Sequence, residues 1–228
     1  MAKARMKRRE SARSSKISEI VGSQPISLPK PSFVRSTSVF AALRGRRTSR
    51  TISDKKLSLQ MLSNLLWAAC GVNRKKGPFG GPGLTAASAS NSQEIDLYVA
   101  LEKGVYRYEP PVHGLLPVVA EDLRALAIGQ GQGKAGAKAP VRLLYVVDID
   151  KFSTAGFQEP GLWDLETQKS YYFVDTGLIA GNVYLFAASQ GLATWFHNCN
   201  KPEVSARLKL RKNQRALFGQ TIGYPGKE

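Results

Sequence analysis

The sequence predicts an α+β protein in which a mostly antiparallel central sheet is flanked by helices. Residues 94–109 alternate between apolar and polar side chains around a Lys-Gly turn, which is typical of a β-hairpin. Residues 142–150 form a β-branched apolar run that indicates a buried central strand. Residues 175–190 indicate a helix that is apolar around most of its circumference, so it belongs in a core or between two subunits. Because the hairpin breaks strict strand–helix–strand order, the class is α+β.

The first 37 residues are expected to form a basic, disordered leader, and residues 38–228 a folded domain. The stretch from Lys3 to Lys56 holds 15 basic and 3 acidic residues, whereas the rest of the chain holds 18 and 14. A segment rich in Lys, Arg, Ser and Pro buries little apolar surface. No apolar run follows the basic start, so we expect neither an export signal nor a membrane span, and a cytoplasmic location.

The elements of the first half follow from local signals. VFAAL, from Val39, predicts a short helix. A second helix is expected between an N-cap at Ser58 and Gly71, because leucines recur there at helical spacing. Residues 72–87 are rich in Gly and Pro and indicate a loop, and residues 119–128 indicate a helix.

The second half is expected to end in a strand, a helix and a strand. Residues 192–196 predict the first strand, residues 202–215 a charged helix, and QTIGYP the last strand. The glycine-rich segment 129–138 resembles a phosphate loop in composition. No strand precedes it and no Lys-Ser/Thr follows its last glycines, so it fails both the Walker and the Rossmann patterns and is expected to be a mobile loop.

The chain offers few metal ligands. Its two cysteines, Cys70 and Cys199, lie far apart, and it has only two histidines, so no metal site is expected. Two buried free thiols fit a reducing compartment. Cys199 is expected to be structural, because a buried free cysteine behaves as a small apolar side chain.

Three separated motifs resemble the nitroreductase-like flavoproteins. They are RRTSR (46–50), ASASNSQEIDLYV (87–99) and DTGLIAGNVYLFAASQGLATWF (175–196), and a closing GYP follows in the order that the family shows. The resemblance covers residues 38–225. LLWAACGVNR and GVYRYEPPVHGLLPV are similar to the branch that contains the SagB-type thiazole/oxazole dehydrogenases.

The resemblance implies an activity and an assembly. It implies a nitroreductase-like fold in a homodimer, with the long central helix buried and FMN bound at the subunit interface. It also implies two-electron transfer from NAD(P)H through the flavin to an organic acceptor such as a nitroaromatic or a quinone. The cofactor carries this chemistry, so no acid/base pair is needed and no catalytic residue is assigned.

The arginine motif is the expected phosphate end of the flavin site. The family pattern implies that Arg46, Arg47, Thr48 and Arg50 contact the phosphate, the ribityl chain and the ring edge. Guanidinium forks suit a phosphate dianion better than ammonium groups do. The alternative is a solvated basic stretch that continues the leader. Relatives often add a Lys/Arg-bearing tail after GYP, for which this chain offers only Lys227.

The other cofactor-binding positions that the resemblance implies are Ser88, Asn91, Gln93, Phe196, His197 and Asn198. Asn91 offers a donor and an acceptor in one plane, which matches the pyrimidine edge of a flavin; the alternative is a turn-forming asparagine. Ala87 stands where the family usually has proline, and WFHNC is bulkier than the family's segment. His197 is a possible proton donor near the flavin, and the alternative is a packed residue.

Two other functions remain open. One is oxidation of a peptide azoline, as in the thiazole/oxazole-forming branch, which requires a partner cyclodehydratase and a tyrosine/lysine pair not located here. The other is a basic nucleic-acid-binding protein. The body shows no helix-turn-helix, RNA-binding or OB signature, so nucleic-acid contact is expected only as non-specific binding by the leader.

Overall fold

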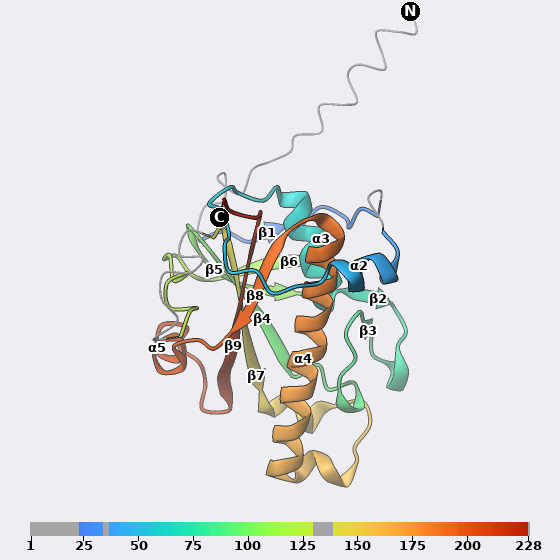
Figure 1. The fold of residues 1–228 in the computed structure, drawn as a ribbon. Helices are drawn as coiled ribbons and strands as arrows, with labels where there is room; N and C mark the ends of the chain where they lie inside the picture. The colour runs from blue at the N-terminus through green and yellow to red at the C-terminus, as the bar shows by residue number, and fades with distance from the viewer. Residues whose placement is uncertain (1–22, 34–36, 130–138, 228) are drawn as a thin grey trace, which may run out of the picture.

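The computed structural model describes residues 23–33, 37–129 and 139–227. In this part of the chain a seven-stranded sheet has the order β1-β6-β5-β4-β7-β9-β8, and every neighbouring pair is antiparallel (Figure 1). Its strands are β1 (Ile26–Ser27), β4 (Ile95–Leu101), β5 (Gly104–Glu109), β6 (Gly114–Val119), β7 (Val141–Asp148), β8 (Ala193–His197) and β9 (Gln214–Gly223). The expected α+β class with a mostly antiparallel sheet is confirmed.

The α-helices of the described residues are α2 (Val39–Gly45), α3 (Leu59–Cys70), α4 (Leu165–Gln190) and α5 (Lys201–Arg207), and short 3₁₀ turns lie at Pro78–Gly80, Ala89–Asn91, Ile149–Thr154 and Pro160–Trp163. Ser58 caps α3, since its hydroxyl accepts a hydrogen bond from the Met61 N–H at 3.1 Å. Gly191 ends α4 with a left-handed φ of 66°. Both boundaries agree with the sequence.

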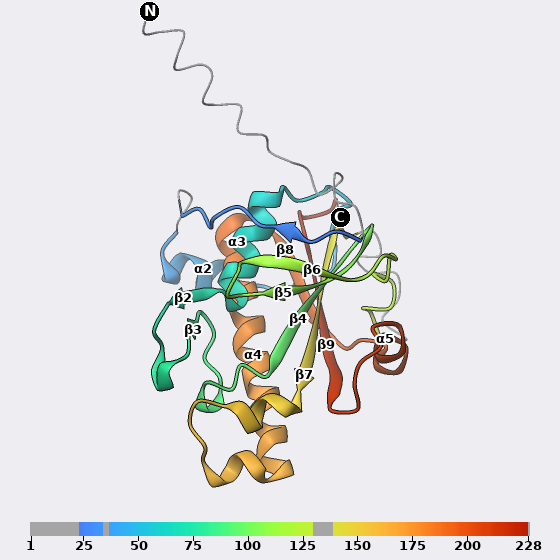
Figure 2. The ribbon, with the colours of Figure 1, turned by 180° about the vertical axis from the view of Figure 1, so that it is seen from behind.

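The sheet separates two apolar clusters. Leu97 and Val99 of β4 face α3 and α4, while Tyr98 and Ala100 face α5. This alternation follows from the two-residue period of a strand. Figures 1 and 2 show α4 running along one side of the sheet while α5 lies apart from it at the end of β8. Both faces of the central strands are therefore covered.

Two expected helices have different bounds. The long helix begins at Leu165, ten residues before Asp175, because the Asp164 carboxylate caps it by accepting from the Thr167 N–H at 2.8 Å. It is buried on one face only, since Val174 and Leu178 are exposed. Residues 202–215 contain only the short helix α5 and the start of β9.

The helix expected at residues 119–128 is wrong. Val119 belongs to β6, and the chain then forms turns. The Leu126 carbonyl accepts from the Asn200 N–H at 3.2 Å, so a contact to the chain after β8 replaces the bond that a helix would make. Tertiary hydrogen bonding overrides the local helix preference here.

Part of the segment 1–37, expected as a leader, packs against the rest of the domain. Ile26 and Ser27 pair with β6, and Leu28 is buried. The Ser32 N–H donates to the side chain of Asn64 on α3 at 2.8 Å. The domain therefore includes residues 26–32, because these residues satisfy their polar groups on α3 and β6. Residues 1–22 lie outside the described part of the chain.

The Gly/Pro-rich segment 72–87 contains a small two-stranded sheet, β2 (Val72–Arg74) with β3 (Gly83–Leu84). The glycine-rich stretch 130–138 lies outside the described residues. Within the described ranges, no helix has both the length and the apolar character needed to cross a membrane. These residues also contain no group of three or more His, Cys, Asp or Glu side chains placed to hold a metal ion.

Candidate active site

The arginine segment (residues 46–50) lies along β8, at the outer edge of the sheet. The Ser49 N–H donates to the Thr194 carbonyl at 2.9 Å, which fixes the segment against the strand. Arg50 lies over the ring of Trp195, with its guanidinium carbon 5.2 Å from the ring centroid. The segment is thus an ordered part of the domain and does not continue the leader as a free basic tail.

Tyr184 of α4 joins this segment to β8. Its hydroxyl is 3.0 Å from Thr48 Oγ1 and accepts a hydrogen bond from the Phe196 N–H at 3.0 Å. With that hydrogen bond accepted, the tyrosine O–H is the natural donor to Thr48. Arg46 lies over the Tyr184 ring, 5.4 Å from the centroid. The structure therefore brings Arg46, Thr48 and Phe196 together around one side chain.

The cationic groups of the arginine segment face solvent. Arg46, Arg47 and Arg50 are exposed, and none of them forms an ion pair with another described residue. Lys227 follows Gly226, whose N–H donates to the carbonyl of Thr51 at 3.0 Å, and Thr51 is the residue directly after this segment. Uncompensated cations beside a hydroxyl form a donor set that suits a phosphate.

A second group of predicted residues forms the amide loop (residues 88–93) before β4. The Ser88 hydroxyl accepts from the Gln93 N–H at 3.0 Å. The Gln93 amide donates to Asn91 Oδ1 at 3.0 Å and to the Pro82 carbonyl at 2.8 Å. Ser90, Asn91 and Gln93 all have positive φ, between 50° and 55°. The loop is held in a strained shape by its own hydrogen bonds, as sites that bind ligands often are.

Two buried carboxyl groups lie beneath the amide loop. Asp175 of α4 accepts from the Ala89 N–H at 2.9 Å, and Glu94 accepts from the Ser92 hydroxyl at 2.6 Å. Burial, together with the neighbouring Asp175 charge, raises the pKa of Glu94 from 4.5 to about 8. Burial also raises the pKa of Asp175, against the effect of the Ala89 N–H. At neutral pH this pair holds the loop with at least one carboxyl protonated.

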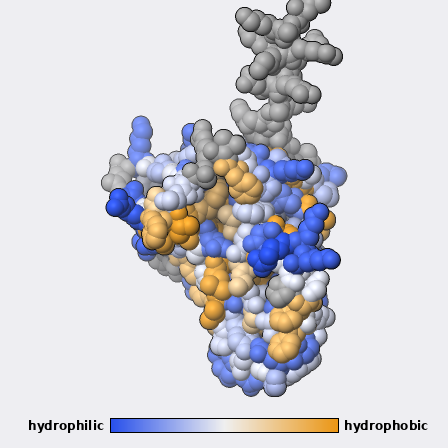
Figure 3. Space-filling view, turned by 90° about the vertical axis from the view of Figure 1, so that its right-hand side faces the viewer, coloured by the Kyte–Doolittle hydropathy of each residue, from blue (hydrophilic) through white to orange (hydrophobic). Residues whose placement is uncertain are grey.

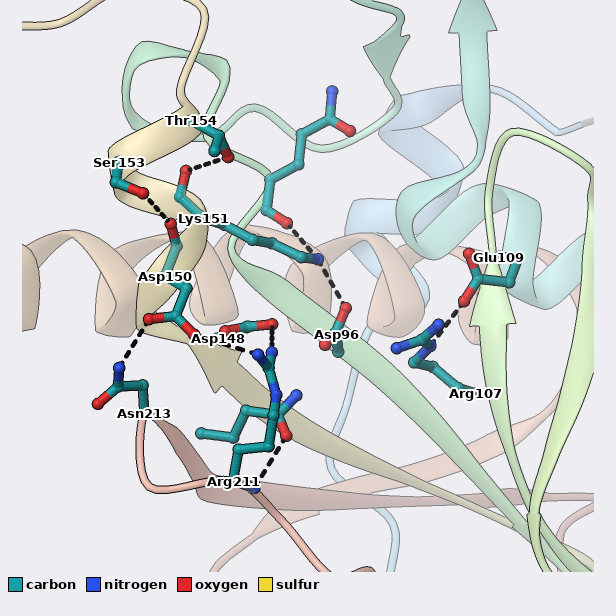
Figure 4. A network of polar contacts seen from close by, with 12 residues as sticks. Asp96, Arg107, Glu109, Asp148, Asp150, Lys151, Ser153, Thr154, Arg211 and Asn213 are labelled. Atoms are coloured by element: carbon teal, nitrogen blue, oxygen red, sulfur yellow. Dashed lines mark hydrogen bonds and ion pairs between the residues drawn. The ribbon is translucent and has the colours of Figure 1, made fainter.

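Lys151 holds the amide loop from its other end. Its ammonium group donates to the Gln93 carbonyl at 3.0 Å and to Asp96 Oδ1 at 2.6 Å. Figure 4 shows Lys151 reaching Asp96, beside a second network in which Arg211 bridges Asp148 and Asp150. The loop is therefore tied to α4 through Asp175 and to the sheet through Lys151.

A cavity of about 450 Å³ opens beside the amide loop. Its lining comes from the loop, from the β2–β3 hairpin and from the segment before α4: Asn73, Arg74, Phe79, Leu84, Thr85, Ala86, Ala87, Ser88, Ser90, Asn91 and Glu159. Ser88 and Asn91, both predicted site residues, thus border open space. Gln93 does not line this cavity.

The three predicted site residues at the end of β8 do not form one cluster; each has different contact partners. Phe196 packs against Tyr145 and Phe218, on the side of α4. His197 is buried and its Nε2 lies 2.8 Å from Thr221 Oγ1, while Asn198 Oδ1 accepts from the Cys199 N–H at 3.0 Å. Burial lowers the pKa of His197 to about 4. Successive residues point to opposite faces of a strand, so His197 lies on the face opposite Phe196, beside Trp195.

The arginine segment and the amide loop lie on opposite faces of α4. They contact Tyr184 and Asp175, which are nine residues apart, or about two and a half turns and about 13 Å along the helix axis. One protomer therefore presents two separate clusters of predicted site residues. Sequence reasoning missed Tyr184, Asp175, Glu94 and Lys151, although a tyrosine and an aspartate within a mainly apolar helix were visible signals.

Residues 43–224 match the Nitroreductase family. A nitroreductase-like protein of Methanocaldococcus jannaschii is 30% identical over 156 residues, which cover 65% of this chain and 72% of that protein. The fold is similar to the crystal structure of a nitroreductase-like protein from Ralstonia eutropha, with a TM-score of 0.79, 31% identity, and 92% and 93% of the two chains covered.

More distant structures share the fold at 18% identity. They are the Escherichia coli microcin synthetase McbBCD complex with truncated pro-MccB17 bound (TM-score 0.64, covering 87% of this chain and 77% of that chain) and the NADPH:FMN oxidoreductase of Vibrio harveyi complexed with NAD+ (TM-score 0.58, covering 83% and 69%). The family match spans most of the described domain, and the similarity to the Ralstonia structure extends over nearly the full length of that chain. The chain belongs to the nitroreductase family.

Proposed function

We propose that the protein is an FMN-dependent oxidoreductase that uses NAD(P)H to reduce a small organic acceptor such as a nitroaromatic or a quinone. The observation that carries the proposal is the arginine segment: Arg46, Arg47 and Arg50 without ion-pair partners among the described residues, beside Thr48. In a member of the nitroreductase family, this donor set fits the phosphate of FMN.

In this proposal each of the two clusters binds a different part of the flavin. Arg46, Arg47, Thr48 and Arg50 hold the phosphate and the ribityl end, and Ser88, Asn91 and Gln93 hold the ring. Bound FMN supplies the redox chemistry, in which two electrons leave the nicotinamide and reach the acceptor. The chain itself orients the ring and excludes water. The Phe196 N–H is engaged by Tyr184, so it supports the site through that hydrogen bond and not through a direct contact to the ring.

We further propose that the active form is a homodimer. The two clusters lie on opposite faces of α4 in one chain, and a two-fold partner that brought its amide loop to the arginine segment would join them around one flavin. Apolar side chains are exposed where α2 and α4 face outward, namely Val39 (67%), Phe40 (86%), Leu43 (51%), Val174 (60%) and Leu178 (44%). Gly177 and Gly181, four residues apart on α4, face open space, which permits close helix packing. Figure 3 shows apolar side chains among hydrophilic ones on the α2 side of the molecule.

The proposal is tested by the absorption spectrum of the purified protein with added FMN. We expect a bound-flavin spectrum that NADH or NADPH bleaches under anaerobic conditions and that a nitroaromatic or quinone restores. A protein that takes up no FMN would contradict the proposal. The azoline-oxidising alternative stays a prediction, because the microcin synthetase complex is similar to this chain in fold. It is distinguished by whether the protein oxidises an azoline peptide.

A further inference from the structure

Phe79, on the wall of the cavity beside the amide loop, belongs to an aromatic pair that the flavin-binding proposal does not use. Phe79 and Phe157 stack with their ring centroids 5.3 Å apart and their planes 22° from parallel. Both rings are about half exposed, at 54% and 50%. Phe79 lies on the turn after β2 and lines the cavity. An exposed aromatic pair at a cavity mouth retains apolar surface that a ligand can cover.

The backbone of Phe79 is held in a strained conformation. Its φ is 58°, a left-handed value that is unusual for a bulky aromatic residue. Four of the six non-glycine residues with positive φ in the described part of the chain are Phe79, Ser90, Asn91 and Gln93. Strain of this kind persists where the surroundings enforce it, and it is concentrated at functional sites. Here it is concentrated around one cavity.

Gly156 permits the aromatic contact. A Cβ at residue 156 would lie 2.6 Å from the Cβ of Phe79, which is closer than real contacts allow. The chain before α4 therefore approaches the β2–β3 hairpin only because this position lacks a side chain. The pair of rings depends on two segments nearly eighty residues apart in sequence, which makes it a built feature of the fold.

The same cavity has a cationic rim. Arg74 lines it, and its guanidinium lies against Gly83, where a Cβ would meet Arg74 Nη2 at 2.5 Å. Arg74, Lys75 and Lys76 are exposed and form no ion pair with another described residue. The acidic residue of the lining, Glu159, accepts from the Ser90 hydroxyl at 3.3 Å. The cavity lining thus joins Phe79, one ring of the stacked pair, to the positive charge of Arg74.

We propose that Phe79, Phe157 and Arg74 form a subsite for a planar aromatic ring that carries a negative charge. The ring stacks on the exposed face of the phenylalanine pair, and Arg74 pairs with the charge. The subsite rests on the proposed function, because it would hold one of the two substrates beside the flavin ring at Ser88 and Asn91. Two substrates have this chemistry: an anionic aromatic acceptor and the phosphate-bearing reduced nicotinamide dinucleotide.

The test compares two nitroaromatics that differ only in charge, 4-nitrobenzoate and neutral 4-nitrobenzamide. For Arg74→Ala we expect the KM for 4-nitrobenzoate to rise about fivefold to tenfold, while the KM for 4-nitrobenzamide changes less than twofold. For Phe157→Ala we expect both KM values to rise about fivefold. Gly156→Ala should act like Phe157→Ala, because it displaces Phe79 without removing a ring. The matched controls are Trp163→Ala, an exposed aromatic residue outside both the cavity lining and the stacked pair, and Lys209→Ala, an exposed cation.

The occupant is identified by measuring the KM for NADPH in the same variants at saturating acceptor. A rise confined to NADPH assigns the subsite to the dinucleotide, and a rise confined to 4-nitrobenzoate assigns it to the acceptor. The proposal is overturned if Arg74→Ala changes none of these KM values, or changes those of 4-nitrobenzoate and 4-nitrobenzamide equally.

Failure of the subsite is distinguishable from failure of the proposed function. In every variant the flavin spectrum should match that of the parent protein. If the parent protein takes up no FMN, calorimetric titration of the flavin-free protein with 4-nitrobenzoate still tests the subsite. Weaker binding in Arg74→Ala than in Lys209→Ala then supports it, and equal binding overturns it.

Discussion

The arginine segment and the amide loop both contact α4, but they differ in exposure and in how their side chains are bonded. The arginine segment is open: its cations lie on the surface along β8 and gain order from Tyr184 and Trp195. The amide loop is closed: its side chains bond to one another, and buried Glu94 and Asp175 support it from below. The first can attract and release a charged group, whereas the second is pre-shaped for a ring edge. In the proposed homodimer, a flavin that spans the two subunits would use one of each.

The largest effect on FMN binding is expected from two variants, each of which removes the side chains of one cluster. Arg46→Ala/Arg50→Ala should lower FMN affinity by about 100-fold or more, since each charge-assisted hydrogen bond is worth about 1.5–3 kcal/mol. Asn91→Ala/Gln93→Ala should also lose flavin. A heterodimer purified from co-expression of both variants should recover one flavin, because one of its two sites then combines an intact arginine segment with an intact amide loop.

Arg44→Ala is the matched control for the arginine variant, since Arg44 ends α2 outside the arginine segment. It should bind FMN as the parent does. A heterodimer with no more flavin than either homodimer would show that each site lies within one protomer.

An effect on stability is expected from Glu94→Gln. The pKa of Glu94 is raised from 4.5 to about 8, so the folded protein keeps a proton that the unfolded chain releases. The stability contribution is fully present below pH 4.5 and is lost as the pH rises toward 8. Glu94→Gln should therefore match the parent near pH 4.5 and exceed it by on the order of 4 kcal/mol at pH 8.

Urea unfolding at fixed protein concentration from pH 4.5 to 8.5 measures this difference. Glu109→Gln, a carboxylate that pairs with Arg107 on β5, serves as the control. A parallel pH dependence in the parent and Glu94→Gln would mean that the buried pair does not hold a proton.

Much of the fold could be predicted because its signals are local. The hairpin of β4 and β5 and the helix capped by Ser58 follow from alternation and capping within a few residues. The turns at 119–128 could not be predicted, because an amide from residue 200 takes the Leu126 carbonyl. The first ten residues of α4 were missed because they lack an apolar stripe and are mostly exposed. The helix there depends on the Asp164 cap.

The residues of the candidate site also fall into those that the sequence could predict and those that it could not. Arg46, Thr48 and Asn91 were found because they stand in motifs that resemble a family. Tyr184 and Asp175 were not, because their contacts join residues 136 and 86 positions apart. A sequence motif names the groups that meet a ligand, whereas the residues that hold those groups in position are visible only in three dimensions.

Tyr184→Phe tests the link between the arginine segment and β8. Removing the hydroxyl leaves Thr48 and the Phe196 N–H without that partner, but keeps the ring beneath Arg46. FMN affinity should fall about fivefold to tenfold, which corresponds to about 1 kcal/mol. Tyr171→Phe, on the same helix but away from the arginine segment, is the control. Flavin titration followed by absorbance measures both, and equal affinities would place Tyr184 outside the site.

The smallest effect on the flavin is expected from His197→Gln. His197 is buried with its Nε2 2.8 Å from Thr221 Oγ1, and its pKa, lowered to about 4 by burial, keeps it neutral above pH 5. FMN affinity should stay within twofold of the parent, and the pH dependence of kcat between 5 and 7 should be unchanged. Because the folded pKa lies below the ordinary 6.5, stability from neutral His197 is present above pH 6.5 and is lost as the pH falls toward 4. The variant should therefore lose part of the acid sensitivity of unfolding, whereas a kcat profile shifted by His197→Gln would restore this histidine as a proton donor.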